Sequence, residues 1–191
     1  MEELHAEGLA THGDPESCAA SREGRGEALA TAAVTYADHL ARLLYTESGA
    51  TDDKRQNPPP KQRGDHQQFA LLAMPLLDGL SEIHVPRVTQ HVVQTTDHIS
   101  SASPKQALLI IVKAVTGDAA YWREPAGADA ALGFIRRFAA DNRAIFLGDH
   151  GAIDLGDHGA IDAVRRLLES FIRLGWPQAI ELAEELDELF S

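Results

Sequence analysis

The stretch from Ala160 to Phe190 constrains the fold most, because it has the pattern of two amphipathic helices joined by Gly175-Trp176-Pro177. Apolar residues recur in both halves at steps of three and four, which places them on one face of each helix. Gly175 stands where a left-handed C-terminal cap is usual, and Pro177 suits the first turn of the next helix. The sequence therefore predicts a helical hairpin whose apolar faces are Ile161, Val164, Leu167, Leu168, Phe171, Ile172 and Leu174, then Ile180, Ala183, Leu186 and Phe190.

The same periodicity predicts helices over residues 27–47, 66–80, 81–100, 103–115 and 129–146. With the hairpin this makes about seven helices, and no segment alternates as a strand does. The fold class predicted is therefore all-α. The residues expected to face inward in the first three are Leu29, Ala33, Tyr36, Leu40, Leu43 and Leu44; Phe69, Leu72, Leu76 and Leu80; and Val85, Val88, Val92 and Ile99.

Two local signals refine these helices. Pro75 lies inside the helix over 66–80 and should kink or split it, because proline removes one backbone hydrogen bond and clashes with the preceding turn. Ser103-Pro104-Lys105-Gln106 has the pattern of a capping box with proline at the first helical position. The segment after it, through Val115, is apolar nearly all round and should form the most buried helix.

The first part of the chain differs from the rest. Residues 1–26 are acidic and polar with almost no large apolar side chain, so they are predicted to be disordered. Residues 27–191 are predicted to form a single helical domain, interrupted by a flexible linker over 50–65. Three consecutive prolines, Pro58 to Pro60, favour an extended spacer within that linker.

Composition excludes several classes of function. The formal net charge of −12, from 29 acidic and 17 basic residues, argues against non-specific binding to a nucleic-acid backbone. No segment approaches the roughly 20 apolar residues that span a bilayer, and the acidic N-terminus is no signal peptide. Cys18 is the single cysteine, so neither an internal disulfide nor a cysteine-based zinc site is expected. A cytoplasmic protein is predicted, and no cofactor-binding motif is present.

His84, His91 and His98 are spaced by seven residues, which predicts a file along the helix over 81–100. Neighbours in such a file lie roughly 10 Å apart, too far for one metal ion with bonds of about 2 Å. We interpret them as half-exposed residues at the rim of the buried stripe. A sharper hypothesis makes them a pH-sensitive helix interface, because histidine titrates near neutrality.

An identical octapeptide occurs twice in tandem, at Leu147–Asp154 and Leu155–Asp162. On a continuous helix its histidines and aspartates would form an alternating file suited to a divalent metal ion. Four glycines interrupt the repeat, and duplication of one His-x-x-x-Asp unit by itself explains the spacing. The candidate metal ligands are His150, Asp154, His158 and Asp162.

The two tryptophans are candidate packing or interaction residues. Trp176 lies at the joint of the C-terminal hairpin, where an aromatic ring packs naturally between two helices. Stacking on a ligand is the alternative role. Trp122 lies in the predicted loop over 118–127.

Paired amphipathic helices with short joints resemble α-solenoids of the HEAT or armadillo kind, in which each pair packs on the next. A compact irregular bundle is the alternative architecture. The C-terminal sequence from Ser170 to Ala179, with Leu186 to Phe190, is similar to the helical tails of large bacterial ATP-binding proteins, some from defence loci. The resemblance covers residues 66–190. It implies a tail or orphan fragment of such a protein, and no nucleotide activity, because the ATP-binding part is absent from this chain.

The leading hypothesis is a non-catalytic helical module that binds a protein partner or serves as a scaffold in the bacterial cytoplasm. A helix-only pattern without a catalytic motif motivates it. The alternative is a metal-dependent enzyme or metal-binding protein that uses the tandem repeat over 147–162.

Overall fold

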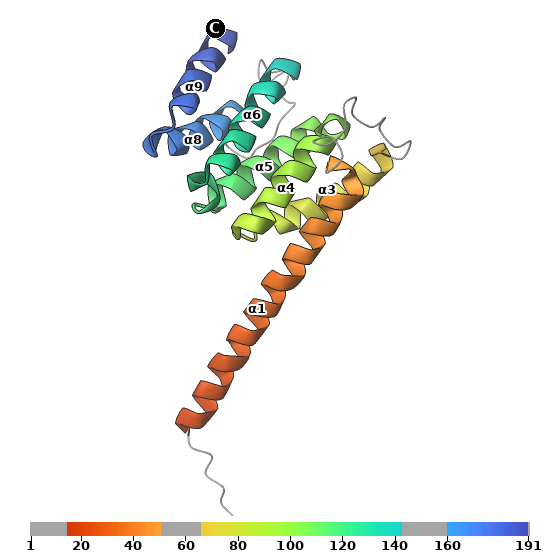
Figure 1. Cartoon of the computed structure of the whole chain (residues 1–191), viewed down its shortest axis with the longest axis vertical. Helices are drawn as coiled ribbons and strands as arrows, with labels where there is room; N and C mark the ends of the chain where they lie inside the picture. Colours follow the sequence, from red (N-terminus) through yellow and green to blue (C-terminus); the bar gives the residue numbers. More distant parts are fainter. Residues whose placement is uncertain (1–14, 51–65, 143–159, 191) are drawn as a thin grey trace, which may run out of the picture. The chain divides into compact units, whose positions relative to one another are not determined.

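The computed structural model describes residues 15–50, 66–142 and 160–190 (Figure 1). Within these ranges seven α-helices pack into a helical bundle and no strand is formed, which confirms the predicted fold class. Two short 3-10 helices, η1 (Ser100–Ala102) and η2 (Tyr121–Arg123), lie in the connections. The α-helices are α1 (Pro15–Ser48), α3 (His66–Leu80), α4 (Pro86–Ile99), α5 (Pro104–Gly117), α6 (Pro125–Asp141), α8 (Ala160–Arg173) and α9 (Pro177–Phe190).

Proline marks the first residue of five of the described helices, α1, α4, α5, α6 and α9. Its fixed φ suits the first turn, and its missing N–H has no partner there in any case. Proline also holds the preceding residue in the extended region, as at Val85 and Glu124. The predicted helix starts at Ser81 and Asp129 are therefore wrong, because the helices begin at Pro86 and Pro125.

Two other local predictions are corrected. Ser103 makes no side-chain capping hydrogen bond, so the proposed capping box does not form. α5 begins at Pro104, which confirms the predicted proline at the first helical position. α3 runs through Pro75 as one helix, so of the two predicted effects, a kink or a split, the split does not occur.

The chain divides into two compact units between Thr35 and Tyr36, within α1. In the first unit the described residues are helical from Pro15, so the predicted helix start at Glu27 is wrong and residues 15–26 are helical. Alanine, glutamate and arginine are frequent in this stretch, and they are good helix formers. Residues 1–14, and residues 51–65 of the predicted linker, lie outside the described residues.

The second unit, from Tyr36 onward, contains two clusters of buried side chains. The first joins α4, α5, α6, α8 and α9 and includes Phe134, Ile135, Leu167, Phe171 and Leu182, all at most 1% exposed. The predicted hairpin is confirmed, since α8 and α9 pack together and are joined at Gly175, whose φ is 81°. Only a residue that tolerates the left-handed region ends a helix in this way without strain.

The second cluster joins the last turns of α1 to α3, α4 and α5. Half of the α1 and α3 side chains in this cluster are alanines. α1 contributes Ala37, Ala41 and Leu44, and α3 contributes Ala70, Ala73, Met74, Leu77 and Leu80.

The inward faces predicted for α1 and α3 are mostly wrong. Leu29, Tyr36 and Leu43 of α1 are exposed, and so are Leu72 and Leu76 of α3. Each of these helices carries a second apolar stripe, rich in alanine, one residue further along the chain. Both stripes have the spacing of a buried helix face. In the folded protein the stripe with the smaller side chains is the one that packs in the core.

None of the described helices is both long enough and apolar enough to cross a bilayer.

Candidate interaction surface

A set of large apolar side chains on α1 and α3 lies open to solvent or only half covered. Leu72 is 69% exposed and Tyr36 is 73% exposed, although both belong to stripes with the spacing of a core face. Leu40 and Phe69 are half-buried and pack against the cluster of α1, α3, α4 and α5. We call the following six residues the α1–α3 face: Tyr36, Leu40, Leu43, Phe69, Leu72 and Leu76.

Helix geometry explains why these residues lie beside the core and not in it. A helix turns about 100° per residue, so a stripe displaced by one residue is displaced by about 100° around the axis. Each member of the face directly precedes a buried residue, as Leu43 precedes Leu44 and Leu76 precedes Leu77. α1 and α3 therefore each present one apolar stripe to the core and another to solvent.

The charge that α3 carries lies on a different side of that helix from the α1–α3 face. Its only Asp, Glu, Lys or Arg is Asp78, which accepts a hydrogen bond of 3.1 Å from Lys113 Nζ on α5. Lys113 also pairs with Glu82 at 2.8 Å, and this contact raises the pKa of Lys113 and lowers the pKa of Glu82. Leu71 shares the side of Asp78, seven residues before it, and we exclude Leu71 from the face.

The three histidines do not form one file. His84 lies in the turn before α4 and is exposed, with its ring against Gly117, so its predicted place on a helix is wrong. His91 and His98 lie on α4 and are half-buried. The ring of His91 stacks on the ring of Tyr45 of α1, with centroids 5.1 Å apart. A Cβ atom added to Gly49, which follows α1, would lie 3.8 Å from His98 Nε2. Both face the end of α1.

Burial lowers the pKa of His91; Arg42 acts in the same direction and Asp38 in the opposite direction. Its Nδ1 is buried without a hydrogen-bond partner among the described residues, which fits a neutral ring. As the pH falls below about 6.5, the unfolded chain binds a proton at this position before the folded chain does. The contribution of His91 to the free energy of unfolding is therefore fully present above about pH 6.5 and is lost as the pH falls below it.

We expect the free energy of unfolding to decrease between pH 7.5 and pH 5.5, with part of the decrease due to His91. In His91→Gln the decrease should be smaller, because glutamine does not titrate. Urea unfolding at the two pH values measures it. His84→Gln is the control for replacing an exposed histidine outside α4. An equal decrease in the free energy of unfolding for wild type and His91→Gln would contradict the assignment.

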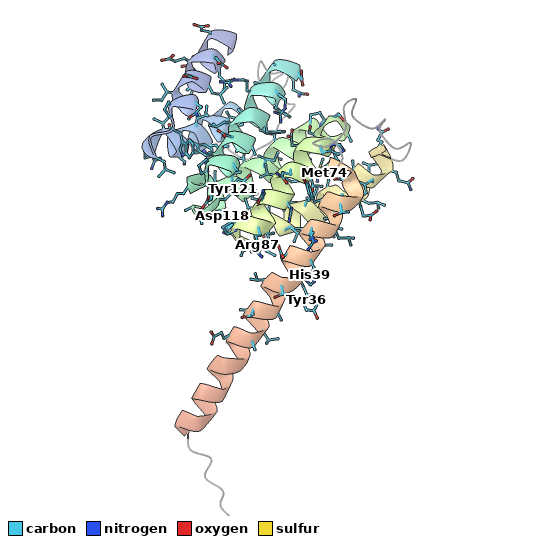
Figure 2. All side chains as sticks on the ribbon, in the orientation of Figure 1. Tyr36, His39, Met74, Arg87, Asp118 and Tyr121 are labelled. Carbon is cyan, nitrogen blue, oxygen red and sulfur yellow. The ribbon has the colours of Figure 1, made fainter. Side chains whose placement is uncertain are left out.

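A buried polar site ties α4 to the connection between α5 and α6. Asp118 is 2% exposed, and its Oδ2 accepts a hydrogen bond of 2.8 Å from Thr89 Oγ1. Its Oδ1 accepts the backbone N–H groups of Ala120 and Tyr121 at 3.1 and 3.0 Å. Figure 2 labels Asp118 and Tyr121 beside each other. Both carboxylate oxygens are engaged by the protein, so this site serves to fix the connection.

Tyr121 follows Asp118 in the same connection. Burial raises the pKa of the Tyr121 hydroxyl, and the charge of Asp118 adds to the effect. The Tyr121 hydroxyl has no hydrogen-bond partner among the described residues. A phenol in this setting stays protonated, so the structure supports a packing role for the ring.

Thr95 and Thr96 of α4 are fully buried, and their hydroxyls lack partners within the described ranges. A buried polar group without a hydrogen bond costs about 1–3 kcal/mol. We expect Thr95→Val to raise the free energy of unfolding by about 1 kcal/mol, because valine has nearly the same shape. Thr89→Val on the same helix is the matched control and should destabilise, since that hydroxyl binds Asp118. Thermal and urea unfolding should show a higher free energy of unfolding for Thr95→Val and a lower one for Thr89→Val.

Three of the four candidate metal ligands, His150, Asp154 and His158, lie outside the described residues. The fourth, Asp162, is half-exposed in the first turn of α8 and lies 3.7 Å from Arg165. In the part of the chain that the structure describes, no group of three or more His, Cys, Asp or Glu residues is arranged to hold a metal ion. Metal binding by the repeat stays a prediction.

Trp176 is half-buried and packs against the cluster that contains Phe171. Its backbone N–H donates a hydrogen bond of 3.1 Å to the Phe171 carbonyl, which closes the joint between α8 and α9. Trp176 also lines an open surface hollow with Arg123 and Gln178. Trp122 lies in η2, and its side chain is outside the described residues.

Comparisons of this chain with known protein families, with curated proteins and with solved structures find no match.

Proposed function

We propose that this chain is a non-catalytic helical interaction module that binds a protein partner through the α1–α3 face. The observation that carries the proposal is the exposure of Tyr36, Leu43 and Leu72, whose stripes have the spacing of a core. Contiguous apolar surface on a folded protein is typical of interaction sites. The acidic remainder of the chain keeps the module dissolved while this face binds.

The predicted likeness to HEAT-type solenoids supports the same function. In a solenoid each helix pair packs on the next, and a pair without a neighbour exposes an apolar face. We propose that α1 and α3 are such a pair. A scaffold of this kind in the bacterial cytoplasm, related to the tails of ATP-binding proteins, is the specific form of the proposal.

Site-specific photocrosslinking tests this function in cells. A photoreactive phenylalanine analogue at Leu72 should give protein adducts on illumination, because this position lies at the centre of the face. The control is the same analogue at Ile180 of α9, which is 47% exposed and lies outside the face. Equal adduct patterns at the two positions, or none at Leu72, would overturn the proposal.

A further inference from the structure

We propose that protonation of His91 releases the C-terminal part of α1 from α4 at mildly acidic pH, while the rest of the second unit stays folded. The proposal goes beyond the proposed function, because it concerns how α1 is held and not what binds to it. Three observations carry it: the contact of His91 with α1, the small side chains that α1 buries, and the closure of the end of α1 by its own residues.

His91 makes an aromatic contact between α4 and the C-terminal part of α1. Its ring stacks on the Tyr45 ring with 29° between the planes, and its Nδ1 is buried without a hydrogen-bond partner among the described residues. A neutral imidazole can leave one nitrogen without a proton, but an imidazolium carries an N–H on both. Protonation in place would therefore bury a charged N–H that has no acceptor, which is costly. Water supplies the acceptor once α1 has moved away.

The charged groups that act on His91 both belong to α1. Burial is the largest influence and lowers the pKa of His91, whereas Asp38 raises it and Arg42 lowers it. No other charged side chain in the described parts of the second unit, including those of α3, α5 and α6, acts on this ring. The face of the Tyr45 ring attracts a cation, as Asp38 does. Because burial dominates, a proton binds more tightly after release, and acid shifts the equilibrium toward release.

Small side chains hold α1 in the second cluster. Its buried members are Ala37, Ala41 and Leu44, so only one of them is larger than alanine, against three in α3. An alanine side chain removes little apolar area from water. α4 and α5 also belong to the first cluster, through Val93 and Leu108, and keep that packing if α1 leaves. Release of α1 is therefore a less costly opening than unfolding of the whole unit.

α1 can leave as an intact helix. Ser48 Oγ donates a hydrogen bond of 2.8 Å to the Tyr45 carbonyl and accepts one of 3.2 Å from the Ala50 N–H, so residues of this segment close its end. Residues 26–31 are exposed and helical, so helix formation in α1 does not require burial. Release then breaks side-chain packing and leaves the backbone hydrogen bonds of α1 in place.

Thiol labelling of the full chain measures release, with Cys18 replaced by serine in every variant. Ala41→Cys places a thiol in the packed surface of α1, and Leu43→Cys, at a position that is 55% exposed, gives the rate for an accessible thiol at each pH. The ratio of the first rate to the second should rise several-fold between pH 7.5 and pH 5.5. One histidine with a released pKa of about 6.5 limits the rise to about tenfold. An unchanged or falling ratio would overturn the inference, and Ala37→Cys is a second probe if Ala41→Cys does not fold.

Ala179→Cys shows whether the opening is local. Ala179 is as fully buried as Ala41 but lies on α9, in the first cluster. At both pH values Ala41→Cys should be labelled at least about tenfold faster than Ala179→Cys, because local opening costs less than global unfolding. Equal rates would mean that both thiols react only in the unfolded chain, and would overturn the inference.

His91→Phe assigns the pH dependence to this side chain. Phenylalanine keeps an aromatic ring against Tyr45 but cannot be protonated, so the labelling ratio of Ala41→Cys should no longer change with pH. His39→Gln is the matched control, since His39 is an exposed histidine of α1, and it should retain the rise (Figure 2). A rise that persists in His91→Phe, or that disappears in His98→Gln, would overturn the inference.

Discussion

Replacing Phe171 with alanine is expected to lower the free energy of unfolding by about 3–5 kcal/mol. Phe171 is completely buried in the cluster that joins α4, α5, α6, α8 and α9. Alanine would leave a cavity that rigid helices on all sides fill only in part. An ordinary domain has only about 5–15 kcal/mol of stability, so the variant should approach the threshold of unfolding. Urea unfolding monitored by circular dichroism measures the loss.

The neighbouring Ile172 is the control for Phe171. It is 37% exposed, so Ile172→Ala should cost much less. A similar loss in both variants would show that burial does not distinguish the two positions, because alanine is the better helix former at each of them. A loss below about 1 kcal/mol for Phe171→Ala would mean that α8 does not pack as described.

Replacing Asp118 with alanine is expected to cost about 1–3 kcal/mol. The substitution removes three hydrogen bonds at once and leaves the Thr89 hydroxyl buried without its acceptor. The Tyr121 N–H keeps a weaker hydrogen bond of 3.2 Å to the backbone carbonyl of residue 118. Hydrogen exchange should show the loss locally, as faster exchange of the Tyr121 amide.

Asp118→Asn separates hydrogen bonding from the loss of the side chain. Its amide oxygen can still accept the two backbone N–H groups, and its NH₂ can donate to Thr89 Oγ1. The asparagine variant should therefore retain most of the stability that the alanine variant loses. Equal losses in the two variants would indicate that the negative charge itself is required.

The helical hairpin at the end of the chain was predictable from local signals. Gly175 and Pro177 specify a helix end and a helix start through their own backbone preferences, which hold in any context. α8 and α9 accordingly begin and end close to the predicted residues. The starts of α4 and α6 at Pro86 and Pro125 have an equally local cause. The predicted starts at Ser81 and Asp129 are wrong because they do not take these prolines as the first helical residues.

The candidate surface could not be predicted, because it depends on which of two apolar stripes is covered. On α3 the sequence contains one stripe with Phe69, Leu72 and Leu76 and another with Ala70, Ala73 and Leu77. Burying a large side chain removes more apolar area from water, so the prediction placed the stripe with the larger side chains in the core. The structure instead buries the alanine-rich stripe, which belongs to the cluster shared with α4 and α5.

The sequence by itself determined the fold class, the helices and most of their ends, because periodicity, proline and glycine act within a few residues along the chain. The tertiary structure decided which faces are covered, that His91 rather than His84 meets α1, and that Asp118 joins α4 to the α5–α6 connection. These contacts join residues far apart in the chain, as Thr89 and Asp118 are, and depend on how helices fit together. Local preference carries no information about that fit.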